Sequence, residues 1–145
     1  MEKKQSDLKI LSIATFIFAA LTAIVVAVAV IFVDYGADLP AEEAGIVNAV
    51  TKVLYVIIGL VIAGLEAYLG YRGLKEVKNP TQGKGHIIIA CVLLVLSVLS
   101  IGSPIVAIFN GVDVWGNIGN IITTLLQAML YLMYAKAARD LQNAA

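Results

Sequence analysis

Four long runs of apolar residues occupy most of this chain. Each run is close to the roughly 20 residues that an α-helix needs to cross a bilayer core of about 30 Å. The runs cover residues 10–33, 53–71, 87–109 and 118–134. Of the 145 residues, 61% are hydrophobic and 14% are charged, whereas soluble domains are roughly half apolar and a quarter charged. The sequence predicts an all-α, integral membrane four-helix bundle that forms one transmembrane domain, residues 1–145.

The positions of lysine and arginine predict the orientation of these spans. Short loops rich in these residues stay in the cytoplasm. Nine of the ten basic residues precede the first span, separate the second from the third, or follow the fourth: Lys3, Lys4, Lys9, Arg72, Lys75, Lys78, Lys84, Lys136 and Arg139. The two opposite connections hold Lys52 and five acids: Asp34, Asp38, Glu42, Glu43 and Asp113. We therefore expect a multi-pass membrane protein with both termini in the cytoplasm.

The connections between the spans are too short to hold a soluble domain. The sequence has no metal-ligand cluster, no nucleophile paired with a base and no complete phosphate-binding loop. The single cysteine, Cys91, excludes an intramolecular disulfide. Without a basic stripe, nucleic-acid binding is not expected. We expect no catalytic, cofactor or metal site and no enzyme activity.

Three residues near the ends of spans predict local structure. Pro40, followed by Glu42 and Glu43, is typical of a helix N-terminus, so the second helix should begin there. Pro104 cannot donate a backbone hydrogen bond, which predicts a kink in the third span, either static or a gating hinge. His86, at the inner start of that span, is expected to be solvated, with a pH-sensitive role as the alternative.

Glu66 interrupts the second apolar run. An ionised acid at the bilayer centre costs at least about 2.5 kcal/mol, so it should face the bundle interior and have a partner. It shares a helix face with small residues at three- and four-residue steps, which allow a neighbouring helix to approach closely: Gly59, Ala63 and Gly70. Glu66 is therefore either a functional acid or a structural one, which is protonated, hydrogen-bonded or extended toward Arg72 or Lys75.

The fourth span carries a polar face along its whole length. Its members follow steps of three and four residues: Asn117, Asn120, Thr124, Gln127, Tyr131 and Tyr134. Such a face cannot point at lipid, because each unsatisfied amide in hydrocarbon costs several kcal/mol. We predict an intramembrane polar cluster of Glu66, Asn120, Thr124, Gln127 and Tyr131. It would serve interhelical hydrogen bonding, a transport path or a ligand pocket.

Small residues also recur on the first span. Thr15, Ala19, Ala23 and Ala27 are four residues apart, which favours close helix packing within one molecule or between copies. With Gly59, Ala63 and Gly70 they make two small-residue faces. These two faces predict a homo-oligomer or a complex with another membrane protein, in a lipid bilayer.

The two even-numbered spans end alike. Residues 68–79 and 131–143 both place two tyrosines ahead of a charged segment that ends in asparagine. This similarity is explained either by two duplicated helical hairpins or by the general preference of membrane interfaces for tyrosines and charges.

Residues 70–80, with the sequence GYRGLKEVKNP, resemble the basic turn of small four-span bacterial membrane proteins of unknown function. The resemblance covers about a tenth of the chain and implies a place in the bacterial cytoplasmic membrane, but no activity. In outline the chain is also similar to small multidrug-resistance exporters, which have four short helices and a membrane glutamate. It departs from them because their acid lies on the first span, whereas Glu66 lies on the second, and because its charge bias is strong.

Three classes of function follow. The first is an accessory or structural subunit that packs its helices against copies of itself or a larger complex. The second is a small proton-coupled transporter that uses Glu66 and the polar face of the fourth helix. A membrane enzyme is the third. A water-accessible Glu66 would favour transport, whereas a dry and hydrogen-bonded Glu66 would favour a structural subunit.

Overall fold

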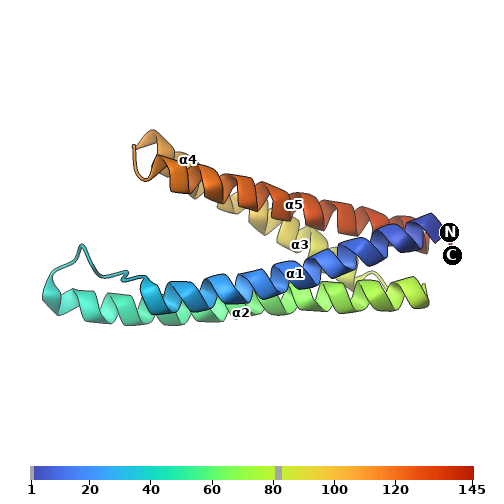
Figure 1. Cartoon of the computed structure of the whole chain (residues 1–145), viewed down its shortest axis with the longest axis horizontal. Coiled ribbons are helices and arrows are strands. Elements are labelled where there is room, and N and C mark those ends of the chain that lie inside the picture. The colour runs from blue at the N-terminus through green and yellow to red at the C-terminus, as the bar shows by residue number, and fades with distance from the viewer. Residues whose placement is uncertain (1, 81–82) are drawn as a thin grey trace. The chain divides into compact units, whose positions relative to one another are not determined.

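The computed structural model describes residues 2–80 and 83–145, and this part of the chain is all-helical, as predicted. The helices are α1 (Glu2–Phe32), α2 (Ala41–Lys78), α3 (Gly85–Ser100), α4 (Gly102–Phe109) and α5 (Val114–Gln142) (Figure 1). With α3 and α4 taken as one interrupted helix of 25 residues, four described helices are long and apolar enough to cross a membrane.

The break between α3 and α4 lies at Ile101, three residues before Pro104. The proline has no N–H with which to continue the helical ladder. Around the break the Ile101 amide donates to the carbonyl of Val98 at 3.3 Å, a tighter turn than an α-helix has. The helix is thus interrupted where the sequence predicts a kink.

The start of α2 also agrees with its sequence. The carbonyl of Pro40 accepts hydrogen bonds from the amides of Glu43 and Ala44, at 2.9 and 3.0 Å. Glu42 and Glu43 lie in the first turn, where the positive end of the helix dipole favours acids. In the connection between α4 and α5, the Asp113 side chain accepts from the Gly116 amide at 3.2 Å and caps α5.

The chain divides into two compact units, to which α1 and α2 both contribute. The terminal unit consists of Met1–Thr15 and Tyr68–Ala145, and the hairpin unit consists of Phe16–Ala67. In the terminal unit α3 lies along α5, and the start of α1 and the end of α5 lie at the same end (Figure 1). That end holds its core, made of Leu8, Leu69, Ala90, Leu93, Tyr131, Tyr134, Ala138 and Leu141.

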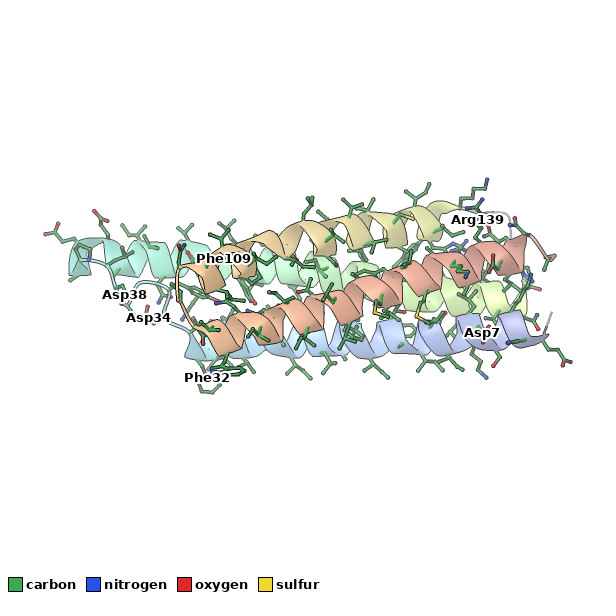
Figure 2. The ribbon with its side chains drawn as sticks, turned by 90° about the horizontal axis from the view of Figure 1, so that it is seen from above. Asp7, Phe32, Asp34, Asp38, Phe109 and Arg139 are labelled. Atoms are coloured by element: carbon green, nitrogen blue, oxygen red, sulfur yellow. The ribbon has the colours of Figure 1, made fainter. Side chains whose placement is uncertain are left out.

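The hairpin unit pairs α1 with α2 and buries smaller side chains. Its buried apolar residues are Ala19, Val26, Ala29 and Ala63. At the end of the pair where the loop joins the two helices, Asp34 and Asp38 lie beyond Phe32 (Figure 2). The loop is held there because the Tyr35 amide donates to Oδ1 of Asn48 at 3.1 Å.

Large apolar side chains are exposed on every helix, among them Phe32, Ile57, Leu99, Phe109 and Leu132. Figure 2 shows Phe32 and Phe109 on the outside of their helices. A monomeric soluble protein rarely leaves apolar surface of this extent facing water.

Candidate functional site

Glu66 lies in the hairpin unit, where it is fully buried. Its Oε2 accepts a hydrogen bond of 2.8 Å from Oγ1 of Thr22 on α1. Two of the small residues on its face, Gly59 and Ala63, are buried beside α1 in the same unit. A methyl group at Gly59 would collide with the side chain of Val26, so the glycine is needed for this close approach. Gly70, the third, is buried in the terminal unit.

The small residues predicted on α1 differ in burial. Thr15 and Ala19 are buried, whereas Ala23 and Ala27 are exposed. The buried side of α1 continues instead through Val26 and Ala29. The reason is geometric: successive four-residue steps rotate about 40° around a helix of 3.6 residues per turn, so a strict four-residue ridge leaves the packed face. Ala23 and Ala27 therefore do not belong to the buried side of α1.

The polar face of α5 becomes more buried toward the end of the helix. Asn120 is exposed, Thr124 and Gln127 are half-buried, and Tyr131 is 1% exposed. At its start, Nδ2 of Asn117 donates to the carbonyl of Val112 at 2.8 Å and so serves the local turn. These residues share one helix of the terminal unit, whereas Glu66 belongs to the hairpin unit. Their cluster with Glu66 stays a prediction.

A second cluster of buried polar side chains, which the sequence analysis did not predict as a cluster, lies in the terminal unit. Glu76, His86 and Tyr134 come from α2, α3 and α5, and each is at most 1% exposed. The Oη of Tyr134 donates to the carbonyl of Leu69 at 2.7 Å. Oε1 of Glu76 accepts from Nε2 of Gln142 at 3.0 Å. These bonds join α2 to α5 at two levels.

Gly73 makes this junction possible. A methyl group built on it would collide with Oγ of Ser12, and it would approach Cε2 of Tyr134 to 2.9 Å. Ser12 is itself fully buried, and its hydroxyl donates to the carbonyl of Leu8 at 2.7 Å. The hydrogen of Gly73 is therefore what lets α1, α2 and α5 meet.

His86 corrects the expectation of a solvated histidine, because its side chain is fully buried. Its ring meets that of Tyr134 edge to face, with centroids 6.0 Å apart. Within the described part of the chain, neither ring nitrogen has a hydrogen-bond partner. The sequence held a signal: His86, Ala90 and Leu93 follow helical steps and form the buried side of α3. That side begins one residue before the apolar run.

Glu76 could have been found in the same way, because Leu69, Gly73 and Glu76 continue one face of α2 past the end of its apolar run. The end of an apolar run in the sequence therefore does not mark the end of the packed face of the helix.

Among residues 2–80 and 83–145, no group of three or more His, Cys, Asp or Glu side chains is placed to hold a metal ion. Chemically, the described polar groups form hydrogen bonds between helices, at Thr22 with Glu66 and at Glu76 with Gln142. Comparison with known proteins does not extend this description. No protein-family model matches the chain, and searches of curated proteins and of solved structures give no match.

Proposed function

We propose that this chain is an integral membrane protein that acts as a helix-packing accessory or structural subunit. The observation that carries the proposal is the environment of Glu66, which is fully buried and hydrogen-bonded to Thr22. A hydrogen bond offsets the cost of placing a polar group in an apolar medium. A proton-carrying acid, in contrast, must meet water during its cycle. The contacts of Glu66 are those of a group that joins two helices.

The proposed setting is the bacterial cytoplasmic membrane, with both termini in the cytoplasm. Three features support it: four membrane-length helices, exposed apolar side chains on all of them, and the collection of basic residues near the inner ends. The proposal includes two duplicated helical hairpins, which enter the membrane in the same direction. Their equivalent tyrosines differ in burial, since Tyr71 is 59% exposed and Tyr134 is 0% exposed.

The subunit is proposed to associate with copies of itself or with a larger membrane complex. Ala23 and Ala27 support this step, because they are exposed and one helical turn apart on α1. Small residues let a second helix approach closely, and van der Waals packing then holds the pair. We expect Ala23→Leu and Ala27→Leu to reduce self-association measured by energy transfer between labelled chains in vesicles. Ile24→Leu, at another exposed position of α1, is the control. Unchanged transfer in both alanine variants would oppose self-association through α1.

An infrared titration of the Glu66 carboxyl group tests the main proposal. The protein would be reconstituted in lipid, and the carboxyl band assigned by its loss in Glu66→Gln. We expect the carboxyl band to shift in Thr22→Val, because the carboxyl group then loses the hydrogen bond from Oγ1 of Thr22. A band that does not respond to Thr22→Val would contradict the structural role, and an acid that carries protons would titrate close to the operating pH.

The alternative is a small proton-coupled transporter. The polar face of α5 favours it, because Thr124 and Gln127 are half-buried and Asn120 is exposed. In that case Glu66 would exchange a proton for a substrate. Proton flux into vesicles that disappears in Glu66→Gln, together with a titrating carboxyl band, would replace the structural proposal with this one.

A further inference from the structure

We propose that the groove between α3 and the end of α5 binds a phospholipid with an anionic headgroup. The inference rests on the proposed membrane location. It concerns the terminal unit alone, and the groove lies outside the buried group of Glu76, His86 and Tyr134. Its volume is about 570 Å³, within the 300–1,000 Å³ of typical ligand sites.

The walls of the groove change character along the helix axes. Its deeper part is apolar and is lined by Cys91 of α3 and Leu132 of α5. The other part, nearest the end of α5, is called its outer part here. It is polar and is lined by Lys136, Arg139 and Asn143, which follow one another at helical steps. A phospholipid has the same order of parts, with acyl chains toward the bilayer centre and a phosphate at the interface. The groove therefore matches a lipid in direction as well as in chemistry.

The charge of the outer part selects the kind of headgroup. Lys136 and Arg139 are both exposed, so their cationic groups are available to a ligand. Asp140 also lines the groove, which leaves one net positive charge among its three charged side chains. This balance complements a phosphodiester without a compensating amine. Basic pockets between membrane helices on the cytoplasmic side bind anionic headgroups in this way.

Hydrogen bonds hold the last turns of α5, which carry the polar residues of the groove. Figure 2 shows Arg139 at the same end of the terminal unit as Asp7. The Lys4 ammonium donates to the backbone carbonyl of Asp140 at 3.2 Å, and Gln142 donates to the carbonyl of Gly83 at 3.1 Å. The last turns of α5 are thus tied to α1 and to the connection before α3. A fixed helix end presents Arg139 and Asn143 to a headgroup at lower entropic cost than a frayed one.

Native mass spectrometry of the full chain, with phosphatidylglycerol and phosphatidylcholine of identical acyl chains, tests this site. We expect tighter binding of phosphatidylglycerol, weakened about fivefold for each cation removed and on the order of 25-fold in Lys136→Gln/Arg139→Gln. Lys75→Gln/Lys78→Gln removes the same amount of charge from the last turn of α2, outside the groove. This control should leave the affinity for phosphatidylglycerol unchanged. Equal affinity for the two lipids, or equal loss in the two double variants, would overturn the proposal.

A steric variant tests whether the lipid binds in the groove or only to the general surface charge. Cys91→Phe fills the apolar part without changing charge and should abolish the tight phosphatidylglycerol adduct, whereas Val92→Phe, exposed on the same helix, should retain it. An unaffected adduct in Cys91→Phe would overturn the site. Flotation of each variant with vesicles distinguishes failure of the proposed membrane function from failure of the proposed lipid site. A chain that does not float contradicts the membrane function itself, while one that floats without lipid preference contradicts only the lipid site.

Discussion

The two units of this chain are built from parts of the same two helices but pack in different ways. The terminal unit buries whole tyrosines and hydrogen-bonded polar groups, such as Tyr134 and Glu76. The hairpin unit brings α1 and α2 together over small side chains, with Gly59 against Val26, and places a single acid between them. In the membrane setting proposed for this chain, apolar side chains gain little free energy by moving from lipid into the protein, so helices associate through close packing and hydrogen bonds. The terminal unit uses large interlocking groups for this, and the hairpin unit uses small ones.

The largest difference should appear when the same residue type is removed from each unit. Tyr134→Ala deletes a fully buried ring, and we expect it to lower the free energy of unfolding by about 3–5 kcal/mol. Tyr55→Ala removes a ring of the hairpin unit that is 38% exposed and contacts Tyr35, so its cost should be much smaller. Reversible unfolding in mixed micelles measures both. Similar losses would mean that the two units are packed alike.

The second comparison adds one methyl group to α2. Gly73→Ala places it against Ser12 and Tyr134, and such overpacking typically costs about 1–3 kcal/mol. Gly64→Ala, on the hairpin part of the same helix, meets nothing within 4 Å and should leave stability unchanged or slightly higher. The same unfolding assay reports on both variants. If Gly73→Ala proved neutral, the close junction of α1, α2 and α5 would be in error.

The third comparison removes one hydroxyl from each unit. Tyr134→Phe loses the bond to the Leu69 carbonyl, and Thr22→Val loses the bond to Glu66. A net hydrogen bond contributes about 0.5–1.5 kcal/mol. We expect Thr22→Val to cost more, because it withdraws a partner from a buried carboxyl group, whereas the Leu69 carbonyl keeps its helical environment. The reverse order of free energies would show that Glu66 does not depend on Thr22.

The smallest expected effect concerns His86. Replacing a buried polar group that lacks partners with an apolar one of similar shape is close to neutral or stabilising. Because both ring nitrogens of His86 are unpartnered within the described chain, His86→Phe should retain or slightly raise the free energy of unfolding. Asn120→Leu, at an exposed position of α5, controls for a general gain in hydrophobicity. A marked loss of stability in His86→Phe would indicate that the imidazole is engaged by a ligand or by water.

These comparisons also show what the sequence could predict. The four helices, the start of α2 at Pro40 and the break before Pro104 follow from local rules: length, capping and a missing N–H donor. The burial of Glu76 and His86 was missed, because both lie beyond the apolar runs and hydropathy assigns such positions to the interface. Ala23 and Ala27 share the spacing of Ala19 but not its burial, since which part of a ridge is covered depends on the path of the neighbouring helix. The sequence predicted features that depend on local chemistry, but it did not predict which helix faces pack against one another.

The division of the chain also sets an order of events during synthesis. The hairpin unit is a continuous segment, whereas the terminal unit joins residues 2–15 to Tyr68–Ala145. At a translation rate of about 5–20 residues per second, the 78 residues that follow Ala67 take roughly 4–16 s to emerge. Throughout that interval all residues of the hairpin unit are present, while those of the core around Tyr134 are still being added. Residues 2–15 therefore wait for packing partners that are synthesised last, whereas the hairpin unit has all of its residues early.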